Sequence, residues 1–124
     1  MPRRHKAHYS LDAWRLAFDF VPIAYQLARQ FPPEERYELS SQLRRAASSV
    51  VLNIAEGAGR HSSPDFCRFL VIARGSITEM DTLLLLAEKM NYITTIQADE
   101  ALATLDHITA LVNGLIRKHS GDRG

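Results

Sequence analysis

Arginine side chains give this chain its clearest capacity for chemistry. A guanidinium group is planar and donates paired hydrogen bonds, which suits it to phosphate. Helical spacing places three arginines at exposed positions, and we assign these to nucleic-acid phosphate: Arg44, Arg60 and Arg68. Two others, Arg45 and Arg74, lie close to apolar positions, where pairing with a carboxylate is favoured. For all five arginines, ion pairing with Glu38, Glu56 or Glu79 is the alternative to phosphate.

A second polar set lies among apolar neighbours. Asn53 and Glu56 flank Ile54 in a helical pattern, and a buried carboxylate needs a partner. We therefore predict a structural network that fixes helix register or holds the glycine turn, although a functional polar site is the alternative. Its members are Arg45, Asn53, Glu56, Arg74 and Glu79.

Other reactive residues lack the partner side chains that a catalytic or metal site needs. A turn separates His61 from Asp65, there is no second histidine pair, and Cys67 is the single cysteine, so we expect no metal. No serine has an identifiable base, and no glycine-rich phosphate loop follows a strand. The aromatic rings of Trp14 and Tyr25 are expected in the core, with base stacking as the alternative. We therefore predict no enzyme activity and no cofactor.

The composition is that of an ordinary globular protein. The chain has 124 residues, 46% hydrophobic residues and a formal net charge of +1, which indicates a single domain over residues 1–124. Basic residues gather in an N-terminal tail, 1–10, and again after Leu115. No apolar run reaches membrane-spanning length, so we expect a cytoplasmic protein without membrane contact.

Apolar residues recur at three- and four-residue steps, which is typical of amphipathic helices. The pattern predicts four helices over about 11–31, 34–56, 63–91 and 96–118, and hence an all-α, antiparallel up-and-down four-helix bundle. In the first helix the inward stripe is expected to continue in phase across Pro22 and to consist of Trp14, Ala17, Phe18, Val21, Ala24, Tyr25 and Ala28. Gly57 and Gly59 are expected to end the second helix in a left-handed cap.

Four successive leucines, Leu83–Leu86, exceed what one buried helix face can hide. Val71 and Ile72 add to this surplus. We expect the excess to be covered by a second subunit rather than by an unusually central helix. The predicted interface residues are Val71, Ile72, Leu83, Leu85 and Leu86.

Several segments carry a resemblance to a known family: 14–17, 31–39, 42–46, Asn53–Arg60 and Phe69–Ser76. Through these segments the chain resembles the four-helix-bundle proteins encoded in intervening sequences of bacterial 23S ribosomal RNA. That family also includes accessory proteins of diversity-generating retroelements. The resemblance implies a homopentameric ring without catalysis and, for the retroelement members, binding to nucleic acid and a reverse transcriptase. Pro22 departs from the unbroken first helix of the family.

The leading hypothesis is a noncatalytic, oligomeric accessory protein that binds RNA or DNA through arginines. Contacts would be electrostatic and would be multiplied by subunit symmetry. The rival hypothesis is a homo-oligomeric scaffold that recruits a partner enzyme and does not touch nucleic acid.

Overall fold

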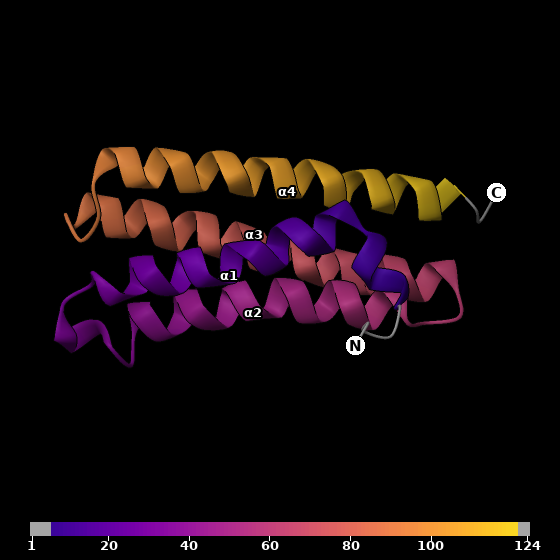
Figure 1. Ribbon diagram of the computed structural model, residues 1–124, viewed down its shortest axis with the longest axis horizontal. Coiled ribbons are helices and arrows are strands. Elements are labelled where there is room, and N and C mark those ends of the chain that lie inside the picture. Colours follow the sequence, from indigo (N-terminus) through magenta and orange to yellow (C-terminus); the bar gives the residue numbers. More distant parts are fainter. Residues whose placement is uncertain (1–5, 122–124) are drawn as a thin grey trace, which may run out of the picture.

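The computed structural model describes residues 6–121 and consists of four long helices packed side by side around one core (Figure 1). The helices are α1 (Asp12–Arg29), α2 (Leu39–Ala58), α3 (Ser63–Lys89) and α4 (Thr95–Gly121). Two short 3₁₀ helices, η1 (Ala7–Ser10) and η2 (Pro33–Glu35), precede α1 and α2. Successive helices run in opposite directions, which confirms the predicted bundle.

The two ends of the bundle differ in construction. One end holds the α2–α3 turn, the start of α1 and the end of α4, and is called the turn end. The other end holds the α1–α2 and α3–α4 connections and is called the loop end. Residues 1–5 of the predicted basic tail lie outside the described residues, and Ala7–Ser10 form η1 rather than a tail.

The core is built from the predicted stripes of α2, α3 and α4. Leu43, Ile54, Leu70, Leu84 and Ile108 are fully buried. In α1 the predicted stripe is right for Ala17, Ala24 and Ala28, which are buried, and wrong for Phe18, which is 51% exposed. Phe20 and Leu27 complete the buried face instead. The buried residues Ala13, Ala17, Phe20, Ala24 and Leu27 also follow helical spacing. The helix continues across Pro22, as expected.

The helix ends explain where the predicted boundaries hold and where they fail. The α2 helix begins at Leu39, five residues later than predicted, because the Glu35 carboxylate accepts a hydrogen bond from Leu39 N and another from the Tyr92 hydroxyl. These contacts favour the separate turn η2 over an earlier start of α2. Asn91, in the left-handed conformation, ends α3 close to the predicted position.

Gly57 and Gly59 do not form the expected left-handed cap, since no glycine among the described residues has a positive φ. Gly57 serves packing instead. A Cβ at this position would lie 2.8 Å from Phe66 Cδ1 and 2.8 Å from Phe69 Cβ. The missing side chain therefore lets α2 approach the first turns of α3.

None of the helices in the described part of the chain combines the length and apolar character needed to cross a membrane.

Candidate nucleic-acid interface

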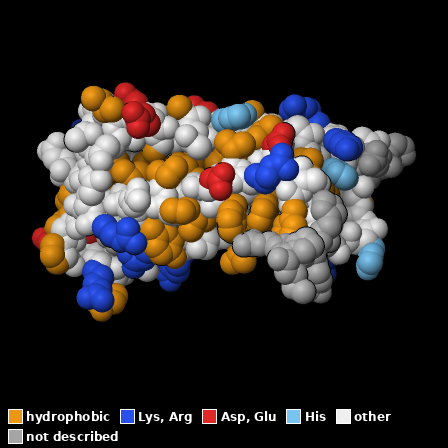
Figure 2. All heavy atoms as spheres, viewed as in Figure 1, with side chains coloured by type: hydrophobic (Ala, Val, Ile, Leu, Met, Phe, Trp, Pro, Cys, Tyr) orange, Lys and Arg blue, Asp and Glu red, His pale blue; other side chains and the backbone are white. Residues whose placement is uncertain are grey.

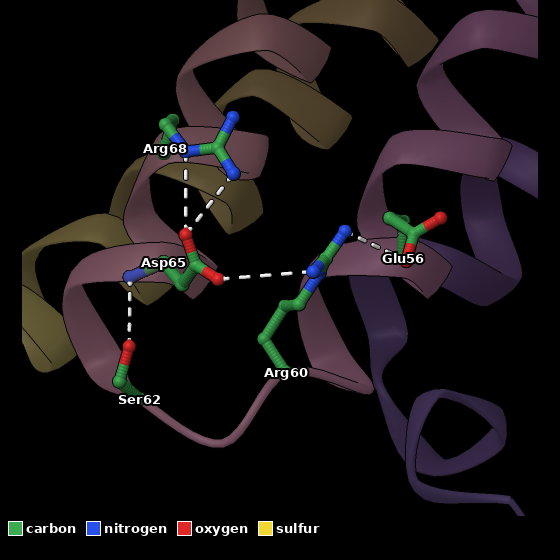
Figure 3. A network of polar contacts seen from close by, with 5 residues as sticks. All are labelled: Glu56, Arg60, Ser62, Asp65 and Arg68. Atoms are coloured by element: carbon green, nitrogen blue, oxygen red, sulfur yellow. Dashed lines mark hydrogen bonds and ion pairs between the residues drawn. The ribbon is translucent and has the colours of Figure 1, made fainter.

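The α2–α3 turn brings two of the three predicted phosphate-binding arginines together (Figure 3). Ser62 caps α3 by accepting a hydrogen bond from Asp65 N at 3.3 Å, which places the Asp65 carboxylate in the first turn. Its Oδ1 accepts from Arg68 Nε at 3.3 Å and from Arg68 Nη2 at 3.1 Å. Its Oδ2 lies 4.0 Å from Arg60 Nη1, and Arg60 Nη2 lies 3.2 Å from Glu56 Oε2. Asp65 therefore lies between the two guanidinium groups.

An aromatic ring also holds both guanidinium groups at this turn. The Arg60 Cζ atom lies 4.8 Å from the centroid of the Phe69 ring, and the Arg68 Cζ atom lies 4.6 Å from it. Both arginines keep substantial exposure, with side-chain accessibilities of 41% and 58%. Cation–π contact orients a guanidinium without using up its hydrogen-bond donors. Both side chains thus remain open to an anionic ligand.

Arg44 does not join this pair. It lies near the start of α2, at the loop end, and its Nη2 donates to the carbonyl oxygen of Arg36 at 3.3 Å. At about 1.5 Å of rise per residue, it is roughly 24 Å along the bundle from Arg60. The three predicted residues therefore do not form one continuous site.

The predicted structural network is wrong as a unit, because Glu56, Arg45 and Glu79 are exposed. Glu56 pairs with Arg60 at the surface and not with a buried arginine. Each of the three lies two residues, or about 200° of helix rotation, after a buried residue, so helical spacing itself already placed these side chains on the solvent side.

Asn53 instead makes contacts within its own helix and across to α3. Its Nδ2 donates to Ser49 O at 2.8 Å and to Ser49 Oγ at 3.0 Å. Ser49 Oγ is 2.8 Å from Ser76 Oγ. This chain of hydrogen bonds links α2 to α3. Asn53 therefore contributes to the packing of the two helices through Ser49 and Ser76, and not through the predicted arginines and glutamates.

Arg74 reaches across to α4, where its Nη1 donates to Asn113 Oδ1 at 2.9 Å. The predicted glutamate partner is replaced by a neutral amide. Arg74 is half-buried and links α3 to α4.

The predicted interface residues divide into two groups. Val71, Ile72, Leu85 and Leu86 are 44–46% exposed on the outer side of α3. Leu83 is 4% exposed and belongs to the protomer core, so its assignment to the interface is corrected. The predicted excess of exposed apolar surface on α3 is therefore confirmed, and it consists of these four residues.

The other candidates have ordinary surroundings. Cys67 is half-buried, with Sγ 3.7 Å from Ile116 O and 3.6 Å from Ser120 Oγ. No group of metal-ligating side chains is found within residues 6–121. Trp14 is half-buried and stacks on Phe18, while Tyr25 is half-buried and lines a surface hollow beside α2.

Charge is distributed unevenly between the two ends. Within about two helical turns of the turn end there are six basic and three acidic residues. The basic residues are Lys6, Arg15, Arg60, Arg68, Arg117 and Lys118, and the acidic residues are Asp12, Glu56 and Asp65. The same span at the loop end holds five basic and six acidic residues: Arg29, Arg36, Arg44, Arg45 and Lys89 against Glu34, Glu35, Glu38, Glu88, Asp99 and Glu100. The sequence signal was present in the basic residues near both chain ends, but only the antiparallel fold brings them to the α2–α3 turn.

Comparison with known proteins gives the chain a family. One solved structure that resembles it is a protein of unknown function from the S23 ribosomal protein family of Bacteroides thetaiotaomicron VPI-5482. The two share 25% sequence identity and superpose with a TM-score of 0.78 over 84% of this chain and 97% of the other. No curated protein matches the chain significantly. The model of the 23S rRNA-intervening sequence proteins matches residues 9–114, and the chain belongs to this family.

Proposed function

We propose that this protein is a noncatalytic, oligomeric accessory protein that binds the phosphate backbone of RNA or other nucleic acid through its turn end. The observation that carries the proposal is the excess of basic over acidic residues at that end, with Arg60 and Arg68 exposed beside Phe69. The loop end has no such excess, so Arg44 is a weaker candidate than the other two arginines.

A net charge of +1 for the whole chain does not oppose this function, because a polyanion responds to local charge. In a cyclic assembly of protomers that stand side by side, symmetry places every turn end on the same face. Several modest basic surfaces then act on one ligand, and their contributions are multiplied. Homopentamers, which the family resemblance implies, would present five such surfaces.

The two carboxylates at the turn end moderate the binding. Glu56 and Asp65 already accept hydrogen bonds or ion pairs from the arginines, so a phosphate group gains only the remaining donors. We therefore expect binding that is weak for one protomer, insensitive to base sequence and steeply dependent on salt.

The test compares two matched variants by salt titration on the same labelled RNA. Arg60→Gln combined with Arg68→Gln removes two charges from the turn end. Arg36→Gln combined with Arg44→Gln removes two charges from the loop end and serves as the control. Each phosphate contact contributes about 0.9 to the slope of log K against log salt on duplexes and about 0.7 on single strands.

We expect the turn-end variant to bind less tightly at low salt, with a slope smaller by about 1.4–1.8 for each protomer that contacts the RNA, and the loop-end variant to bind like the parent. Equal losses in the two variants would show that binding is not located at the turn end. A parent protein that does not bind RNA or DNA even at low salt would refute the proposal and favour the protein-interaction scaffold.

A further inference from the structure

The outer side of α3 is an apolar surface that nothing in the protomer covers. Val71, Ile72, Leu85 and Leu86 are each 44–46% exposed, and Gly75 lies between them along the same side of the helix. We call these five residues the α3 face. The apolar residues form two patches, Val71 with Ile72 and Leu85 with Leu86, about four helical turns apart, and Thr78, Glu79 and Thr82 lie between them on the same side. Exposed apolar patches repeated along one side of a helix favour an interaction site over ordinary surface.

Gly75 leaves the middle of the α3 face open to close approach by another molecule. Glycine inside a helix is unfavourable relative to alanine by about 1 kcal/mol, and a glycine there lets another backbone approach closely. A Cβ built on Gly75 meets no atom within 4 Å, so no other element within residues 6–121 makes such an approach. At Gly57, by contrast, the protomer itself fills the space. The open position at Gly75 fits close approach by a second chain.

A second apolar surface lies between α1 and α2. Phe18, Val21, Pro22, Val51 and Leu52 line a hollow of about 370 Å³, which we call the α1–α2 groove. Phe18 is 51% and Leu52 67% exposed. Figure 2 shows hydrophobic side chains gathered along the seam between these two helices. This groove arises because the true inward stripe of α1 leaves Phe18 outside the core.

We propose that the α3 face of one copy of this chain docks into the α1–α2 groove of a second copy. The inference rests on the oligomeric part of the proposed function and specifies its contact. The two surfaces match in character, since each presents exposed apolar side chains along the side of the bundle. Because they are different surfaces, the contact is heterologous, and repeating it produces a closed ring if the rotation closes.

Charge complementarity supports this pairing over the pairing of two α3 faces. Glu79 is exposed and follows Gly75 by one helical turn, and Arg45 is exposed on α2 in a hollow that adjoins the groove through Ser48 and Leu52. Within residues 6–121 neither side chain forms an ion pair. A face-to-face pair of α3 helices would bring Glu79 near its own copy, whereas the groove offers an arginine.

The test uses one variant for each surface. Leu85→Asp places a charge on the α3 face, and Leu52→Asp places one in the lining of the α1–α2 groove. Ile96→Asp is the control, because Ile96 is 71% exposed near the start of α4 and belongs to neither surface. Light scattering at micromolar concentration gives the mass of each protein, and thermal melting followed by circular dichroism verifies that each is folded.

We expect the parent and Ile96→Asp to form the same closed oligomer, and Leu85→Asp and Leu52→Asp each to be monomeric. An equimolar mixture of the two monomeric variants should form heterodimers and nothing larger, because the intact groove of one receives the intact α3 face of the other. Assembly of Leu52→Asp to the parent's size, or a mixture that stays monomeric, would overturn the inference.

A charge exchange provides the second test and does not depend on the apolar substitutions. Arg45→Glu and Glu79→Arg should each weaken assembly, and the double variant should restore it. A double variant weaker than both single variants would contradict the pairing. RNA titrations of the same proteins keep the two proposals apart, because a monomeric variant still carries the turn end and should retain weak, salt-dependent binding.

Discussion

The turn end and the loop end of this bundle share one core but differ in their surfaces. Both are closed by helix-capping devices, with Ser62 and Asp65 at the start of α3 and Asn91 at its end. The turn end carries the basic excess and the tight contact at Gly57, whereas the loop end is slightly acidic and is held by the Tyr92–Glu35 hydrogen bond. The core determines that the bundle folds, and the surfaces distinguish one end from the other.

The largest expected effects test whether the core is equivalent at the two ends. Leu70, in the half near the turn end, and Leu84, in the half near the loop end, are both 0% exposed. Replacing either with alanine should lower the free energy of unfolding by about 2–5 kcal/mol, because transfer and cavity terms add. Urea denaturation of the two variants gives the comparison. A loss below about 1 kcal/mol at one end only would show that the core is not equally packed.

Gly57→Ala should also destabilise, by about 1–3 kcal/mol, because its methyl group would overlap Phe66 and the Cβ of Phe69. Gly75→Ala is the matched control. It adds the same methyl group in open space, where helix propensity favours alanine by up to about 1 kcal/mol. Thermal melting of both variants at concentrations where the protein is monomeric makes the measurement. A Gly57→Ala variant as stable as the parent would refute the close-contact explanation for this glycine.

Glu56→Ala should change stability by no more than about 1 kcal/mol, because the Glu56–Arg60 pair is exposed and such pairs contribute little. This reverses what a buried Glu56 would predict, which is a loss of several kcal/mol. Urea denaturation distinguishes the two cases. Removal of this carboxylate should also strengthen RNA binding at the turn end, since Arg60 loses a competing partner.

The smallest effect concerns pH at the loop end. The Tyr92 hydroxyl donates to Glu35 Oε2 at 2.8 Å, and this hydrogen bond, with burial and the nearby carboxylates, raises the pKa of Tyr92. A raised pKa in the folded state means that the bond stabilises the protein below the ordinary tyrosine pKa of about 10. The stabilisation is lost as pH rises through the raised value. Tyr92→Phe should therefore be less stable than the parent near neutral pH, with the difference shrinking in strongly alkaline solution. A difference independent of pH would contradict this account.

The sequence by itself determined the four helices, the stripes of α2, α3 and α4, and the exposed surplus on α3. Helical periodicity is strong over segments of 20 or more residues, so local pattern suffices for these elements. It also identified Arg60 and Arg68 as exposed, because each lies off the apolar stripe.

Only the tertiary structure decided the rest. The phase of α1 was ambiguous, since two stripes follow the same spacing, and packing against α2 and α4 selected Ala13, Phe20 and Leu27 over Phe18. The start of α2 depended on Glu35 meeting Tyr92, a residue far away in the chain. The charge difference between the two ends of the bundle arises because antiparallel packing brings the start of α1 and the end of α4 close to the α2–α3 turn. Such effects depend on contacts between distant segments, which no local pattern contains.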